Sequence, residues 1–247
     1  YLELENGGKA MSSYEKAAAQ APNDPIPLVK AARVASRGRL YSQSISLYQK
    51  ALKLDPKFAD AYFELGEVYY YDKQYDKVAG EFQKYSDLRP QDNEARSKLS
   101  SLYFANKDYE KAITEATKGI ANDPNDFVFR RILYYGNYEL KNYDSAYTEM
   151  NKFWAIKDKK VNELDYVYSA RIANEKSDTS QAIGFFDNAL KANEGNCDLR
   201  NEYSRMLYQN RKYTEAVNQY LTLKSKCGGK LSSLDVFYFG RSYYNLG

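Results

Sequence analysis

The 247-residue sequence contains no histidine and only two cysteines. The lack of histidine excludes Ser-His-Asp and Cys-His nucleophiles, histidine metal sites and the HExxH zinc motif. The cysteines do not form a CxxC pair, so they do not indicate a redox or zinc motif. Carboxylates such as Asp60, Glu64 and Glu67 on one predicted helical face are the best acid-base candidates, and such groups are usually only solvated. We expect a protein that is not an enzyme and has no metal and no cofactor.

The sequence also lacks a long apolar run and a block of one charge. No stretch approaches the roughly 18 to 20 apolar residues that cross a bilayer, and the first residues do not resemble a signal peptide. The chain does not begin with Met, so membrane association through a missing part of the protein stays open. Its 36 Lys and Arg against 33 Asp and Glu give a net charge of +3, with the two signs mixed. Because nucleic-acid binding needs clustered cations, we expect no nucleic-acid partner.

Internal repetition is the strongest feature that the sequence does have. Two columns recur every 34 residues, namely Pro22, Pro56, Pro90 and Pro124, and Tyr41, Tyr75, Tyr109 and Tyr143. Between the columns, apolar residues such as Tyr62, Leu65 and Tyr69 follow the three- and four-residue spacing of an amphipathic helix. Each unit is therefore predicted to be two helices joined by a tight turn, with the proline where the second helix must stop.

Residues 59–92 resemble the tetratricopeptide repeat. The matching residues are Tyr62, Leu65, Gly66, Tyr69, Tyr75, Phe82 and Pro90. The resemblance covers essentially the whole chain and implies an all-α, right-handed superhelical solenoid of antiparallel helix hairpins. We expect a single solenoid over residues 1–247. Its predicted parts are the second helix of a truncated repeat (1–24), hairpin repeats 25–58, 59–92, 93–126, 127–160, 161–196 and 197–232, and the first helix of a truncated repeat (233–247).

Two of these repeats are longer than 34 residues. We place the extra residues of repeat 161–196 between its helices, in Glu175–Thr179, and those of repeat 197–232 at Gly228–Lys230. Small residues are predicted where the helices of a hairpin cross: Gly66, Ser100 and Gly240 on first helices, and Ala112, Ala146, Ala182 and Ala216 on second helices. The columns that contain Tyr41, Tyr75, Tyr103 and Tyr109 are predicted to pack inward.

The two cysteines fall at the same end of one predicted hairpin. Cys197 opens the first helix and Cys227 closes the second, so the two sulfurs could meet. A disulfide would favour a periplasmic or exported protein over a cytoplasmic one, whereas two unpaired thiols remain an equal alternative.

The resemblance implies that the first helices line a concave face that binds a partner. The residues in phase with this face are Arg33, Arg37, Phe63, Glu67, Tyr70, Tyr71, Lys98, Phe104, Arg131, Tyr135 and Tyr138. Tyrosine and arginine are frequent at the energetic centres of interfaces. Some family members clamp a terminal carboxylate with Lys and Asn on successive first helices. That clamp is not evident here, because the corresponding places hold Val29 and Arg33, then Phe63 and Glu67.

The sequence therefore favours a non-catalytic protein-protein interaction module or scaffold. It would bind a peptide segment or a partner protein on the concave face, and the sequence does not identify that partner. The alternative is a structural assembly component of a bacterial cell-envelope complex that self-associates or stacks through uncapped ends.

Overall fold

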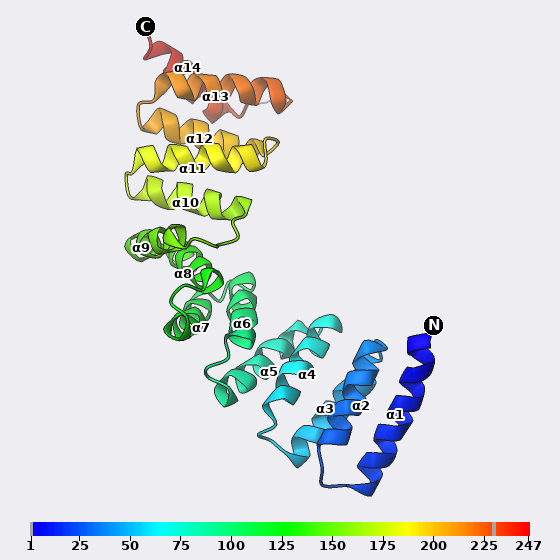
Figure 1. Cartoon of the computed structure of the whole chain (residues 1–247). Coiled ribbons are helices and arrows are strands. Elements are labelled where there is room, and N and C mark those ends of the chain that lie inside the picture. The colour runs from blue at the N-terminus through cyan, green and yellow to red at the C-terminus, as the bar shows by residue number, and fades with distance from the viewer. Residues whose placement is uncertain (1, 229–230) are drawn as a thin grey trace. The chain divides into compact units, whose positions relative to one another are not determined.

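The computed structural model describes residues 2–228 and 231–247, and its regular secondary structure there is entirely helical (Figure 1). The helices are α1 Leu2–Gln20, α2 Ile26–Arg37, α3 Tyr41–Leu54, α4 Ala59–Tyr71, α5 Tyr75–Leu88, α6 Asn93–Ala105, α7 Tyr109–Asn122, α8 Phe127–Glu139, α9 Tyr143–Ala155, α10 Glu163–Glu175, α11 Thr179–Ala192, α12 Cys197–Gln209, α13 Tyr213–Lys226 and α14 Ser233–Tyr244. They form two compact units, residues 1–132 and 133–247. None of the described helices is long and apolar enough to cross a membrane.

Each unit is a stack of helix hairpins. In the first unit, α2 packs on α3, α4 on α5 and α6 on α7, while α1, α3 and α5 each pack on the helix that follows. In the second unit, α10 packs on α11 and α12 on α13, and α14 packs on α13 and α12. The predicted fold class, an all-α solenoid of antiparallel helix hairpins, is confirmed. We use "first helix" below for the even-numbered helices α2 to α14.

The turn inside each hairpin has one repeated conformation. Its middle residue has positive φ and is never glycine: Arg39, Lys73, Lys107, Lys141, Ser177 and Arg211. In the second of these turns, the Gln74 N–H donates to the Tyr69 carbonyl at 2.9 Å and the Lys73 N–H donates to the Tyr70 carbonyl at 3.1 Å. These bonds use carbonyls that the end of a helix leaves unpaired, so the left-handed residue ends the first helix and reverses the chain.

The extra residues of the fifth predicted hairpin do not lie where the sequence placed them. Helix α10 ends at Glu175 and α11 begins at Thr179, which is the spacing of the other hairpins. The prediction of an insertion in Glu175–Thr179 is therefore wrong. The connector between α9 and α10 is the longer one, covering residues 156–162, because a connector can lengthen without disturbing the turn inside a hairpin. The connector after α13 is also longer, and Gly229 and Lys230 of the predicted Gly228–Lys230 insertion lie outside the described residues.

Small residues let the paired helices approach. Ala112, Ala146, Ala182 and Ala216 are fully buried, as their predicted place at the helix crossings requires. A methyl group added to Gly66 would lie 2.7 Å from the Phe82 ring. The inward tyrosine column is less regular than predicted, because Tyr75 is 48% exposed and contacts Tyr70. Tyr75 is the first residue of α5, so it lies at the rim of the hairpin.

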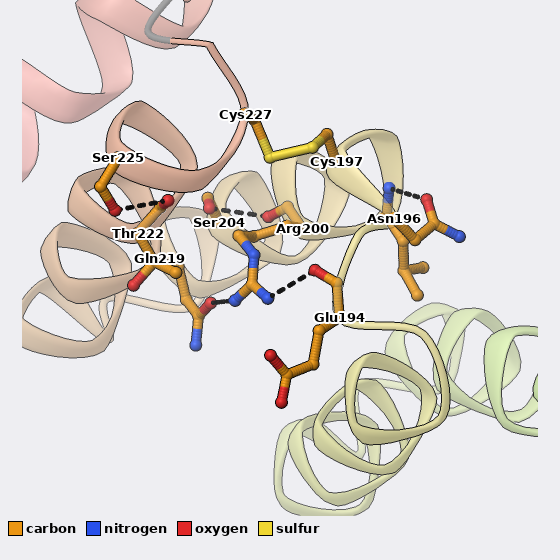
Figure 2. The surroundings of a disulfide bond; sticks show 10 residues. Glu194, Asn196, Cys197, Arg200, Ser204, Gln219, Thr222, Ser225 and Cys227 are labelled. Atoms are coloured by element: carbon orange, nitrogen blue, oxygen red, sulfur yellow. Dashed lines mark hydrogen bonds between the residues drawn. A yellow bond between two sulfur atoms is a disulfide. The ribbon is translucent and has the colours of Figure 1, made fainter.

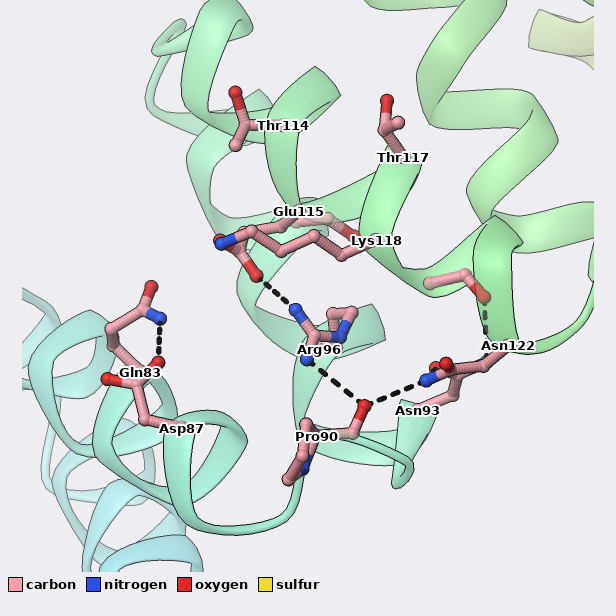
Figure 3. Close-up of polar contacts among 12 residues, drawn as sticks. Gln83, Asp87, Pro90, Asn93, Arg96, Thr114, Glu115, Thr117, Lys118 and Asn122 are labelled. Carbon is pink, nitrogen blue, oxygen red and sulfur yellow. Dashed lines mark hydrogen bonds and ion pairs between the residues drawn. The ribbon is translucent and has the colours of Figure 1, made fainter.

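Two buried arginines hold connectors to first helices. Arg96 of α6 donates to Glu115 of α7 at 2.8 Å and to the Pro90 carbonyl at 3.3 Å (Figure 3). Arg200 of α12 repeats the arrangement, with Gln219 of α13 at 2.8 Å and the Glu194 carbonyl at 3.3 Å (Figure 2). Each guanidinium donates to a carbonyl of the connector that precedes its helix and so fixes where the chain enters that helix. The aliphatic part of the arginine side chain packs in the core.

A disulfide joins the two cysteines at the open end of the α12–α13 hairpin (Figure 2). Cys197 is the first residue of α12, and Cys227 follows the last residue of α13. Their Cα atoms are 5.9 Å apart, within the range that a disulfide spans. Arg200 lies one helical turn from Cys197, so a covalent bond and a buried guanidinium fix the same end of this hairpin.

Candidate functional site

The first helices of the N-terminal unit form a groove of about 460 Å³ between α4 and α6, with α5 as its floor. We call it the N-terminal groove. It is lined by Glu67, Tyr70, Tyr71, Val78, Phe82, Ser97, Lys98, Ser101, Leu102 and Ala105. Four of the residues that the sequence predicted for partner binding, Glu67, Tyr70, Tyr71 and Lys98, therefore lie together.

The tyrosines of the N-terminal groove are exposed although they are large and mostly apolar. Tyr70 is 52% exposed and Tyr71 is 60% exposed. Their rings meet edge to face with centroids 5.8 Å apart, and Tyr70 meets Tyr75 in the same way at 5.6 Å. The three rings support one another beside a floor that contains buried Val78 and Phe82. An exposed aromatic cluster beside an apolar floor is typical of a surface that binds a partner.

Lys98 is held in the same groove by its neighbours. Its Nζ lies 2.5 Å from Glu67 and 3.5 Å from Glu94, and it sits 4.5 Å from the centroid of the Phe63 ring. Burial lowers the pKa of Lys98, but the hydrogen bond and charge of Glu67 outweigh it and raise the pKa. Phe63, another predicted residue, is half-buried against Phe82. Its ring faces the ammonium group of Lys98, so little of the Phe63 side chain is free to contact a partner.

The two predicted arginines of α2 differ. Arg33 forms a forked ion pair with Glu64 of α4, with its Nε 2.8 Å and 2.7 Å from the two carboxylate oxygens. The hydrogen bond to Glu64 raises the pKa of Arg33. The Tyr48 hydroxyl donates to the same carboxylate at 2.5 Å. Arg37 is exposed in the last turn of α2, where a cation suits the helix macrodipole.

The remaining predicted residues are half-buried or buried. Phe104 meets Tyr109 with ring centroids 5.4 Å apart, and the Arg131 guanidinium lies 5.6 Å from the Phe127 ring. Tyr135 is only 4% exposed, and its hydroxyl donates to buried Asp165 at 2.9 Å. The prediction that Tyr135 is exposed for a partner is therefore wrong, because a carboxylate on the next first helix draws its hydroxyl inward.

The second unit has a different groove, which the sequence analysis missed. We call it the C-terminal groove; its volume is about 560 Å³. It is lined by Tyr138, Arg171, Asn174, Glu175, Phe186, Asp198, Asn201, Glu202, Arg205, Met206 and Gln209. Tyr138 is the one predicted residue among them. Burial raises the pKa of Tyr138 to about 12. Polar side chains of α10 and α12 form most of this surface, in contrast to the N-terminal groove.

Ion pairs between successive first helices cross this face in both units. Arg171 of α10 forms a forked pair with Glu202 of α12, with two bonds of 2.7 Å. Arg205 of α12 lies 2.6 Å from Asp235 of α14. The hydrogen bond to Glu202 raises the pKa of Arg171. Burial would raise the pKa of Asp235, but hydrogen bonds from Arg205, Ser232 and Asn201 lower it below the ordinary value. Like Arg33, both arginines of the C-terminal groove are therefore already paired.

The misplaced insertion explains why Arg171 was missed, but not the groove residues of α12, because α12 begins at Cys197, the start of predicted repeat 197–232. Glu67, Tyr135, Arg171 and Arg205 are each the ninth residue of their first helix. Starting the fifth hairpin at residue 161 instead of Glu163 puts buried Ser169 at the ninth position and hides Arg171. A signal did exist in the sequence: Arg33 and Glu64, and Arg171 and Glu202, are oppositely charged and 31 residues apart.

Comparison with known protein families finds tetratricopeptide repeats within residues 36–127 of the chain. One family profile, described as TPR repeat, matches residues 36–72, and a second, described as Tetratricopeptide repeat, matches residues 73–127. No curated protein matches the chain significantly by sequence.

Several solved structures share the fold at low sequence identity. YrrB, described as a TPR protein with an unusual peptide-binding site, is 18% identical with a TM-score of 0.62, and the match covers 73% of this chain and 92% of YrrB. Pseudomonas aeruginosa PilF is 18% identical with a TM-score of 0.59, covering 83% of this chain and 92% of PilF. A chain of the Naa15/Naa10 complex bound to HypK-THB is 14% identical with a TM-score of 0.67, covering 98% of this chain but 37% of its own length. These likenesses show the fold alone.

Proposed function

Since the chain belongs to the tetratricopeptide repeat family, we propose that it is a non-catalytic module that binds a segment of a partner protein on its first-helix face. The observation that carries this proposal is the N-terminal groove, where Tyr70 and Tyr71 stand exposed beside an apolar floor. Burying such rings supplies large area at little cost in side-chain entropy, because each has only two side-chain torsions.

The groove suits a polypeptide better than a small molecule. It is open, it lies between neighbouring first helices, and its polar groups, Glu67 and Lys98, neutralise one another. An extended or helical segment could cover the tyrosines with apolar side chains while its backbone meets Ser97 and Ser101 at the edge. The peptide-binding site described for YrrB supports the use of this fold for such a ligand.

Affinity capture from source cells tests the proposal. We expect Tyr70→Ala/Tyr71→Ala to lose specific partners that the wild type retains. Leu40→Ala/Leu54→Ala is the control, because it removes two exposed large apolar side chains of the same unit that do not line the groove. A photo-crosslinker in place of Tyr71 should then mark the partner directly. Equal recovery of every partner by the wild type and the groove variant would reject the proposed site.

A second function, assembly by stacking, is supported by α14. Its exposed large apolar residues are Leu234, Val236, Phe237, Tyr243 and Tyr244. An apolar helix face of this size suits association between copies or with another envelope protein, and the disulfide suits an oxidising compartment. Light scattering distinguishes the two functions: assembly predicts oligomers that Tyr243→Ala/Tyr244→Ala weakens, whereas a monomer at all concentrations contradicts self-assembly.

A further inference from the structure

We propose that the C-terminal groove binds a cationic segment of a partner protein, one that carries lysine or arginine side chains. The inference rests on the proposed function, in which the first-helix face holds a polypeptide. It adds the chemistry of the ligand at one part of that face.

Carboxylates outnumber cations around the C-terminal groove. Arg171 is neutralised by Glu202, and Arg205 by Asp235. Among the described residues, Glu175 and Asp198 have no ion-pair partner, yet both line the groove and both are exposed. Two cations and three carboxylates line the groove. Asp235, which is buried outside the lining, pairs with Arg205. Glu175 and Asp198 are therefore the two carboxylates left without a cation in the described part of the chain. A concave site lined by one sign of charge attracts the opposite sign.

The position of Glu175 is not explained by helix stability. It is the last residue of α10, where the helix macrodipole disfavours a negative charge by about 0.3 to 1 kcal/mol. Its two cationic neighbours are already paired with other carboxylates, Lys176 with Asp144 and Arg171, one helical turn earlier, with Glu202. A charge that destabilises its own helix and faces a groove is better explained by a ligand. Asp198 lies in the first turn of α12, where a carboxylate also suits the macrodipole, so Glu175 is the stronger indication.

The exposed charged groups of the groove are hydrogen-bond acceptors. Asn201 donates its amide nitrogen to Asp235 at 2.9 Å, and its amide oxygen is buried without a donor among the described residues. A ligand therefore meets the carboxylates of Glu175 and Asp198, which are exposed. Lysine and arginine carry donors only, so they suit a surface whose free groups are carboxylates. Tyr138 adds an aromatic ring to the lining of the groove, and such a ring can also attract a cation.

Two comparisons within the chain sharpen this inference. The whole chain carries a net charge of +3, so long-range attraction would favour an anionic ligand, and binding of a cation must come from a local site. In the N-terminal groove the pairing of Lys98 with Glu67 leaves no comparable excess of charge. The two grooves therefore differ in the ligand chemistry that they favour.

Calorimetric titration of the full chain tests the inference. The probes are two capped peptides, Lys-Ser-Lys-Ser-Lys and Glu-Ser-Glu-Ser-Glu, each at low and at physiological ionic strength. We expect the lysine peptide to bind more tightly, with an affinity that falls as salt rises. Glu175→Gln/Asp198→Asn should weaken its binding by about tenfold or more, because both free carboxylates are removed.

Asp76→Asn/Glu110→Gln is the matched control. It makes the same change of charge at exposed residues of α5 and α7 in the other unit, and it should bind the lysine peptide as the wild type does. Equal weakening by both double variants, or no weakening by the groove variant, would overturn the assignment. Tighter binding of the glutamate peptide would also overturn it. The proposed function fails separately, if Tyr70→Ala/Tyr71→Ala loses no partner in the capture experiment.

Discussion

Some glycines of this chain lie so close to a neighbouring helix that a side chain would not fit, and others have free space around them. A methyl group on Gly119 would lie 2.3 Å from the ring of Phe129, and one on Gly66 would lie 2.7 Å from the ring of Phe82. Both rings are buried, so they can move aside only by disturbing the core. Gly240 is the eighth residue of its first helix, as Gly66 is of its own, but it has nothing within 4 Å.

Single alanine substitutions at these glycines should therefore change the free energy of unfolding in opposite directions. We expect Gly119→Ala to lower the free energy of unfolding by about 1 to 3 kcal/mol through overpacking. Gly66→Ala should cost less, because its contact is longer and the gain in helix propensity partly offsets it. Gly240→Ala should stabilise α14 by up to about 1 kcal/mol, since only the propensity changes. Chemical denaturation of the three variants measures these effects, and a wild-type midpoint for Gly119→Ala would contradict the packing.

Tyr135 shows why single residues are harder to predict than columns. Periodicity placed it on the first-helix face, yet Asp165 of the next first helix draws its hydroxyl into a buried contact. The partner lies 30 residues away, so no local pattern reveals it. Arg171, in the same helical position, stays at the surface because Glu202 pairs with it there.

The helices themselves could be predicted because the repeat fixes their phase. The tyrosine column marks the first residue of α3, α5, α7 and α9, and the prolines Pro56, Pro90 and Pro124 lie in the connectors after α3, α5 and α7. The insertion near residue 160 could not be placed in the same way, because the proline column is lost there and Asp158 occupies its position. The bounds of α10 and α11, together with the left-handed turn at Ser177, show that this hairpin has the standard length.

The left-handed turns make a second prediction. A non-glycine residue with positive φ carries a steric cost of roughly 1 kcal/mol that glycine avoids. Lys73 has φ 61° and is exposed at the α4–α5 turn. We expect Lys73→Gly to raise the free energy of unfolding by several tenths of a kcal/mol, and Lys73→Val to lower it because β-branching opposes this conformation. Thermal melts of the two variants should move in opposite directions, and a shift in the same direction would contradict the assigned turn.

Stacked hairpins contact mainly their neighbours, so stability is a sum of local contributions. The ion pairs Arg33–Glu64 and Arg171–Glu202 join adjacent first helices, but they are partly exposed. Each is therefore expected to contribute at most about 1 kcal/mol. The buried contacts of each hairpin supply more, which means that damage to one hairpin should remain near it.

The disulfide tests this local character. Cys197 and Cys227 are 30 residues apart, and in the chain-entropy model such a closure stabilises by about 3 to 4 kcal/mol. Reduction, or Cys197→Ser/Cys227→Ser, should therefore increase amide hydrogen exchange in α12, α13 and α14. Helices α4 and α5 of the other unit should keep their protection, because no neighbour of theirs is changed. Equal loss of protection throughout the chain would show instead that the two units unfold as one cooperative body, and the nearest-neighbour description would then fail.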